Sequence, residues 1–289
     1  MSSLDAVRAR FARNEGLPFA DILTENSIRD VLNEHGVKYR DRVFNPVTTI
    51  WGFVGQVLSE DHSCRDAVSR IIAHRVANGA PVCSPNTASY CNARSRILTI
   101  VLSTLAIRTA QELQASIANQ WKWNGRSVFI FDGSTVSMPD TPLNQAMYPQ
   151  PPKQEPGLGF PLARIGVLLS LATGACHNLA IDAYSGKGTG ETSLFRRVYD
   201  TLKPGDVVVA DALFDNYYIA CELRQRGIDI VARVQHNERA GSWTKESRPD
   251  GEILVWPRPR RAQGMTGTQY RSYPKQLTMR QVSVDARDK

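Results

Sequence analysis

Apolar residues recur at helical spacing through the first part of the chain. The clearest stretch has apolar positions at i, i+3, i+4, i+7 and i+8, which form one face of an amphipathic helix: Ile50, Phe53, Val54, Val57 and Leu58. Ser27 and Ser63 stand where the N-caps of two further helices are expected, and another helical stretch runs from about 90 to 105. The pattern predicts an all-helical domain over residues 1–124.

The pattern changes after residues 121–126, where short apolar runs of strand length replace the helical spacing. Residues 127–131 and 206–210 are rich in β-favouring side chains and are typical of buried strands. A hairpin is expected from two further runs, 165–171 and 176–183, joined by Thr173-Gly174. Two helices and a last strand follow at 192–202, 216–226 and 228–234. This order predicts an α/β fold over residues 125–235, with a mixed sheet whose helices alternate with strands only in its second half.

Two regions depart from this regular alternation. The proline-rich segment 139–161 is expected to be an irregular surface loop. Beyond His236 the sequence is polar, with strand-like pieces at 252–256 and 278–284. Residues 236–289 are therefore predicted to be a separate, β-rich and basic region.

Two of the predicted strands end on an aspartate. Asp132 follows the run 127–131, and Asp211 follows the run 206–210. An aspartate after a strand is usually a turn residue or an N-cap, but two at strand ends of one sheet can meet at the edge where α/β sheets place their sites. Paired carboxylates favour a divalent cation with oxygen ligands, Mg²⁺ or Mn²⁺, of the kind that serves phosphoryl transfer. A third acid has no recognisable pattern among four glutamates: Glu222, Glu238, Glu246 and Glu252.

The charge of the chain favours a polyanionic partner. The formal net charge is +7 and the pI is about 9.3. From Pro257 onward, eight basic residues oppose two acidic ones, which makes Arg258, Arg260 and Arg261 candidate DNA contacts. A solvated surface segment explains the same charge equally well.

Two other places offer basic side chains to DNA. Residues 66–78 and 87–96 could form a helix-turn-helix that presents Arg94 and Arg96, although the turn is longer than the compact motif allows and simple bundle packing is the alternative. Lys187 stands among the glycines of 185–192, where it could touch a phosphate or belong to a flexible loop. The glycine spacing there excludes a Walker loop.

Other classes of function find no support. The sequence has no apolar run of membrane-spanning length, no zinc-ligand spacing and no serine-hydrolase elbow. Residues 1–5 lack a basic start followed by an apolar run, and the five cysteines are widely spaced, so we expect a cytoplasmic, nucleoid-associated protein with reduced thiols.

The motifs at both aspartates resemble one transposase family. The likeness rests on Phe131-Asp132-Gly133-Ser134-Thr135, on Gly188-Thr189-Gly190-Glu191, on 205–214, and on 84–96 in the helical part. These segments are similar to transposases of bacterial insertion sequences, the family named for insertion sequence four, which have a ribonuclease H-like catalytic domain and an Asp-Asp-Glu triad. The resemblance implies that Asp132 and Asp211 are the first two triad acids and bind Mg²⁺. It also implies double-stranded DNA partners, namely transposon ends and target DNA, and a possible homodimer in a synaptic complex.

The sequence departs from the family at the third acid. The family places this acid in a helix reading Tyr-x2-Arg-x3-Glu-x6-Lys, and no such pattern follows Tyr270-Arg271. We therefore expect a truncated transposase that is inactive alone. Two alternatives stay open: a non-catalytic DNA-binding fragment that competes with a full-length enzyme, and a nuclease of the same fold that uses an unrecognised acid.

Overall fold

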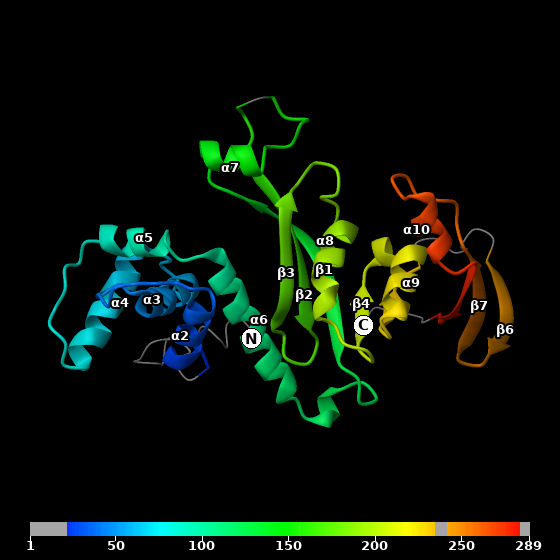
Figure 1. Cartoon of the computed structure of the whole chain (residues 1–289), viewed down its shortest axis with the longest axis horizontal. Coiled ribbons are helices and arrows are strands. Elements are labelled where there is room, and N and C mark those ends of the chain that lie inside the picture. The colour runs from blue at the N-terminus through cyan, green and yellow to red at the C-terminus, as the bar shows by residue number, and fades with distance from the viewer. Residues whose placement is uncertain (1–21, 156, 235–241, 284–289) are drawn as a thin grey trace. The chain divides into compact units, whose positions relative to one another are not determined.

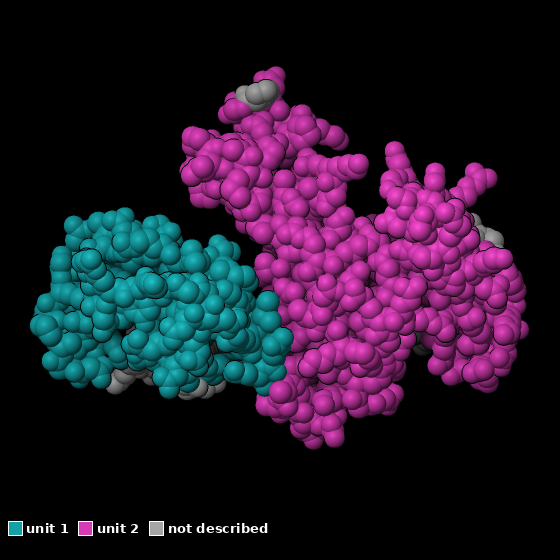
Figure 2. Space-filling view, in the orientation of Figure 1, with its two compact units in different colours: residues 1–112 teal, residues 113–289 magenta. Residues whose placement is uncertain are grey.

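The computed structural model describes residues 22–155, 157–234 and 242–283. The chain divides into two compact units, Met1–Glu112 and Leu113–Lys289, which Figure 2 colours separately. None of the helices in the described part combines the length and the apolar character that a membrane span requires. The start of the chain, residues 1–5, and the basic residues Arg287 and Lys289 lie outside the described residues.

The first unit is built from helices and, within its described residues, contains no strand. Its helices are α2 (Glu25–Glu34), α3 (Pro46–Leu58), α4 (Cys64–Ala77), α5 (Ala88–Arg94) and α6 (Thr99–Ala115), of which α6 runs on past the unit's boundary. The predicted N-cap at Ser63 is confirmed, because its side chain accepts a hydrogen bond from the Asp66 backbone. The predicted cap at Ser27 is wrong. Thr24 caps α2 instead, and its hydroxyl accepts the Ser27 N–H at 3.1 Å.

The buried face of α3 differs from the one that the apolar spacing predicts. Val57 is 54% exposed, whereas Ile50, Trp51 and Gly52 are buried. Gly52 explains the shift, because a Cβ there would lie 2.7 Å from Cδ1 of Ile71 on α4. Since α3 is apolar on nearly every side, the helix turns its glycine side toward its neighbour, where the closest packing is possible.

The second unit contains a five-stranded mixed sheet in the order β3-β2-β1-β4-β5. The strands are β1 (Val128–Ser137), β2 (Leu162–Ser170), β3 (Cys176–Ala183), β4 (Val207–Ala210) and β5 (Asp229–Ala232). β1, β2 and β3 pair antiparallel, while β4 pairs parallel with both β1 and β5 (Figure 1). This confirms the predicted mixed α/β sheet with its antiparallel hairpin.

Two helices lie in the crossovers of the parallel half. α8 (Glu191–Val198) and a following 3₁₀ turn (Tyr199–Thr201) connect β3 to β4, and α9 (Tyr217–Gln225) connects β4 to β5. The segment 139–161, expected to be irregular, contains the short helix α7 (Pro142–Met147), which projects beyond the sheet (Figure 1). The Thr141 side chain caps α7 and Pro142 occupies its first turn, a position where proline costs no hydrogen bond.

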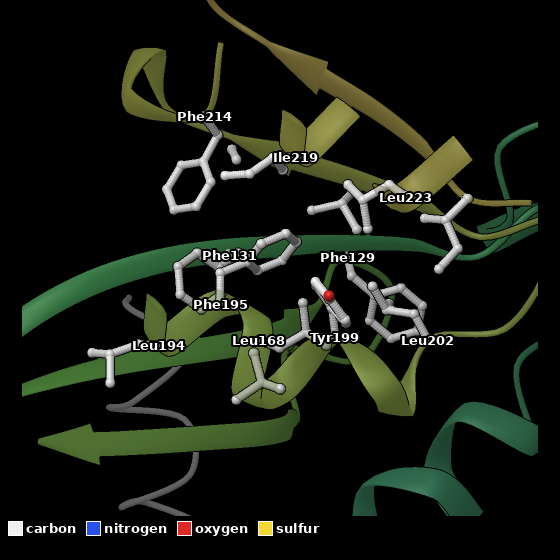
Figure 3. Packing of buried hydrophobic residues seen from close by; sticks show 14 of the residues in the cluster. Phe129, Phe131, Leu168, Leu194, Phe195, Tyr199, Leu202, Phe214, Ile219 and Leu223 are labelled. Atoms are coloured by element: carbon white, nitrogen blue, oxygen red, sulfur yellow. The ribbon is translucent and has the colours of Figure 1, made fainter. Parts of the chain in front are cut away.

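An aromatic cluster holds β1 against α8 and the segment after β4. The Phe131 ring lies 4.8 Å from that of Phe195 and 5.2 Å from that of Phe214, measured between centroids (Figure 3). The rings of Phe195 and Phe214 are 5.3 Å apart. Because all three side chains are buried in one core, the first half of β1 and the residues after β4 have fixed positions.

A smaller three-stranded sheet packs beside α9. It consists of β6 (Trp243–Arg248), β7 (Gly251–Pro257) and β8 (Gln276–Gln281), with α10 (Gly267–Ser272) between β7 and β8. Tyr217 of α9 packs with Trp256 and Leu277 in a buried cluster. The strands expected at 252–256 and 278–284 correspond to β7 and β8, with Val284 outside the described residues.

The buried histidine of β3 predicts a dependence of stability on pH. His177 is 5% exposed, its ring stacks 4.8 Å from Phe129, and its Nδ1 finds no partner within the described residues. Burial lowers the pKa of His177 below its usual 6.5, although the Thr201 backbone and Asp206 partly oppose this shift. The unfolded chain therefore binds more protons than the folded chain below about pH 6.5, so stability falls as the pH drops through that value.

Replacing this histidine tests the effect. We expect His177→Leu to lose less stability than the wild type when urea unfolding is compared at about pH 8 and about pH 5.5. Equal losses in the two proteins would show that His177 does not titrate differently on folding.

Candidate active site

The register of the parallel pair β1–β4 brings the two predicted aspartates to the same level. Val128 pairs with Val207, and Ile130 pairs with Val209. The same register, continued two residues further, sets Asp132 beside Asp211. The backbone is still extended at Asp211, with φ −72° and ψ −177°, although the pairing of β1 with β4 itself ends at Ile130 and Val209.

The alternation of side chains places both aspartates on the same, exposed face. Phe131 and Ala210, one residue earlier on each strand, are buried in the core of the unit. Because successive side chains of a strand point to opposite faces, Asp132 and Asp211 face away from that core, and both are exposed.

Each aspartate uses one carboxylate oxygen to fix its own orientation. Oδ1 of Asp132 accepts the Gly133 N–H at 2.9 Å, and Oδ1 of Asp211 accepts the Leu213 N–H at 2.9 Å. Asp211 is thus also the N-cap of a 3₁₀ turn, Ala212–Phe214. Within the described residues neither carboxylate forms an ion pair, so each keeps a free oxygen of the hard type that Mg²⁺ prefers.

A third acid approaches β1 at the residue after Asp132, from the face of the sheet opposite to the one that Asp132 occupies. Glu191, the first residue of α8, lies over Gly133, and a Cβ on Gly133 would fall 2.6 Å from the carboxyl carbon of Glu191. The sequence interpretation included Glu191 in a motif but gave it no role. The signal was the glycine after Asp132, which leaves room for a side chain from another element. Even so, no three His, Cys, Asp or Glu side chains in the described residues are grouped as a metal site requires.

The close approach of Glu191 to Gly133 predicts a coupling between the two positions. Gly133→Ala would place its methyl group against the Glu191 side chain, which has to move aside, and should lower the free energy of unfolding by up to about 1 kcal/mol. In a Glu191→Ala background the same substitution should cost little, and urea unfolding of the four proteins measures the difference. An equal cost in both backgrounds would contradict this contact.

The glutamates considered as the third acid are engaged elsewhere. Arg196 donates to both carboxylate oxygens of Glu222, at 2.8 and 3.1 Å, and the Tyr273 hydroxyl donates to Glu222 at 2.7 Å. This arrangement ties α8, α9 and the smaller sheet together. Glu246 forms a bidentate pair with Arg248, and Glu252 accepts a hydrogen bond from the Thr244 hydroxyl. Glu238 lies outside the described residues.

The basic residues predicted to contact DNA have different environments. Arg94, at the end of α5, donates to Oε1 of Gln56 at 2.8 Å and lies 5.1 Å from the Phe53 ring, so it packs within the first unit. Arg96 is exposed. Lys187 is exposed in the loop before α8, between Gly186 and Gly188, which both have positive φ.

The three arginines after β7 also differ from one another. Nη1 of Arg258 donates to the carbonyl oxygens of Tyr270 and Tyr273, at 2.8 and 2.7 Å, and its guanidinium lies 4.1 Å from the Tyr270 ring. Arg258 therefore fixes the local chain. Arg260 and Arg261 are exposed.

Comparison with known proteins places this arrangement in a family. A family model described as "Transposase DDE domain" matches residues 123–283, more than half of the chain. Among solved structures, a chain of the piggyBac transposase synaptic complex with hairpin DNA is similar at 11% identity and a TM-score of 0.36. The alignment covers 87% of this chain and 62% of that one, so this chain spans less than two thirds of its length. No curated protein sequence matches this chain. The match over β1, β4 and the smaller sheet shows that the chain belongs to the family of transposase DDE domains.

Proposed function

We propose that this protein is a DNA transposase of the family named for insertion sequence four, which cuts transposon ends and joins them to target DNA by Mg²⁺-dependent phosphoryl transfer. The observation that carries the proposal is the β1–β4 register, which, continued by two residues, would align Asp132 with Asp211 in a transposase DDE domain. Residues 125–235 form the catalytic core in this proposal, with a ribonuclease H-like fold. Residues 1–124 form a helical domain that assists DNA binding, and residues 236–289 form a β-rich insertion.

The free oxygens of Asp132 and Asp211 would hold Mg²⁺. Bound there, the ion would polarise the scissile phosphate and lower the pKa of an attacking water. Both aspartates are anchored to backbone N–H groups, so little side-chain entropy is lost when they bind the ion. Their exposed position suits a polymeric substrate, since a DNA backbone can lie across the open face while a deep pocket would exclude it.

The proposed reaction has two displacements at phosphorus. In the first, a water oxygen bonds to phosphorus at the transposon end, and the 3′-oxygen leaves with a proton. In the second, the freed 3′-hydroxyl attacks a phosphodiester of the target, and the 3′-oxygen of the target leaves. Two copies of the chain in a synaptic complex would bring both transposon ends to one target.

The family's third acid is missing from the sequence pattern, and this bears on the activity of the chain alone. No Tyr-x2-Arg-x3-Glu-x6-Lys pattern occurs in the 289 residues. We therefore propose that the chain alone binds DNA and cleaves it slowly or not at all. The absence of this acid also supports the second candidate, a DNA-binding protein that competes with a complete enzyme.

Nicking of a supercoiled plasmid that carries the DNA flanking the gene separates these functions. Mn²⁺- or Mg²⁺-dependent nicking that is lost in both Asp132→Asn and Asp211→Asn supports the enzyme. Salt-sensitive binding without cleavage supports the DNA-binding alternative. Cleavage that persists in both aspartate variants would refute the proposed site.

A further inference from the structure

Two arginine side chains approach the same point at the start of α10, away from the aspartates. Nη1 of Arg271 lies 3.3 Å, and Nη1 of Arg261 lies 3.7 Å, from the position that a Cβ of Gly267 would occupy. Both side chains are exposed. The absence of a side chain at Gly267 thus leaves room for two positive charges to converge on one point.

The chain segment that carries Arg261 is held in place by buried and half-buried groups. The Tyr218 hydroxyl of α9 donates to the carbonyl oxygen of Arg260 at 2.9 Å. Arg258 donates to two carbonyl oxygens at the end of α10. The Tyr270 hydroxyl donates to the carbonyl oxygen of Pro259 at 3.1 Å. Because the backbone next to Arg261 is held on both α9 and α10, the fold rather than a free loop brings the two arginines to the same place.

The two guanidinium groups have no anionic partner in the described part of the chain. Arg248 and Arg280, on the strands of the same small sheet, form ion pairs with Glu246 and Asp250. No carboxylate is paired in this way with Arg261 or Arg271 within the described residues. Like charges at short distance repel, and an anion between them removes the repulsion.

A phosphate group is the anion that fits such a pair. A guanidinium presents planar, parallel N–H donors that match phosphate oxygens, and it stays charged at every physiological pH. We propose that Arg261 and Arg271 together clamp one phosphate of a DNA backbone. The DNA part of this inference rests on the proposed function. A contact of this kind positions the duplex without reading its sequence.

Binding of a mixed-sequence duplex to the full chain tests the clamp, with EDTA present so that no cleavage occurs. Two guanidinium groups on one phosphate should act as a unit, so Arg261→Gln and Arg271→Gln should each weaken binding several-fold and the double variant little further. The slope of log K against log salt should fall by about one in the double variant. A fall of about two in this slope would mean that the two arginines contact separate phosphates. An unchanged affinity would mean that neither arginine contacts the DNA. Either result overturns the clamp.

A matched variant and a second ligand make the test specific. Arg280→Gln changes the net charge equally, but Arg280 is paired with Asp250, so binding should change less than twofold, or about 0.4 kcal/mol. Inorganic phosphate, followed through the arginine side-chain NMR signals, should perturb Arg261 and Arg271 together. If the protein bound inorganic phosphate at these arginines but did not bind the duplex, DNA would be rejected as the ligand. Because Mn²⁺ binding at the aspartates is measured without DNA, failure of the clamp and failure of the metal site are distinguishable.

Discussion

Asp132→Asn and Asp211→Asn are each expected to weaken Mn²⁺ binding at least about tenfold, because removal of a direct carboxylate ligand should cost no less than the 10–100-fold lost when an outer-shell partner is removed. Each substitution keeps the acceptor oxygen that anchors the side chain to the Gly133 or Leu213 N–H, and asparagine is as good an N-cap as aspartate. The fold should therefore survive, and only the negative charge is removed. Isothermal titration calorimetry with MnCl₂ measures the change.

A control for this prediction lies in the same unit. Asp140 is exposed before α7 and accepts a hydrogen bond from Gln145. Asp140→Asn removes the same charge away from the aspartate pair, so Mn²⁺ affinity should stay within about twofold of the wild type. An equal loss of affinity in all three variants would mean that Mn²⁺ binding depends only on the net charge of the protein.

Phe131→Ala is expected to lower the free energy of unfolding of the second unit by about 3–5 kcal/mol, the usual cost of removing a fully buried aromatic side chain. Phe131 is 1% exposed and contacts Phe195 and Phe214, so its loss leaves a cavity between β1 and α8 that the surrounding rings cannot fill (Figure 3). Urea unfolding followed by far-ultraviolet circular dichroism measures the change. Because Asp132 is the next residue, we expect the folded variant to bind Mn²⁺ more weakly than the folded wild type.

The same strand supplies the comparison for this substitution. Val136 is 40% exposed near the end of β1, and Val136→Ala should change stability by no more than about 0.5 kcal/mol. If Phe131→Ala cost as little as Val136→Ala, the aromatic cluster would not be the core that positions the aspartate.

The sheet could be predicted from the sequence where burial leaves a clear pattern. The runs before Asp132 and Asp211 are continuous stretches of β-favouring residues, which is what strands buried on both faces require. β6 was not predicted, because all six of its residues are exposed and polar side chains dominate it. α7 was missed because the prolines around it suggest a loop, although proline is well tolerated in the first turn of a helix.

The candidate site could be predicted only in part. The prediction that a strand ends at each aspartate is right for Asp211, which follows β4, but wrong for Asp132, because β1 continues past it to Ser137 and pairs with β2 along its whole length. Whether the two aspartates share a level depends on the β1–β4 register, which the sequence does not reveal. Glu191 was given no role, since its approach to Gly133 depends on how α8 packs on the sheet. Arg94 was given a possible role in DNA binding, but it packs within the first unit. Its partner Gln56 is 38 positions away, and only the packing of α5 on α3 brings them together.

The position of the metal tests the central claim most directly. Crystals of the full chain soaked in Mn²⁺ and measured at a wavelength where manganese scatters anomalously should show a peak within about 2.0–2.3 Å of a carboxylate oxygen from both Asp132 and Asp211. No peak at this edge of the sheet, or a peak bound by only one of the two aspartates, would contradict the account.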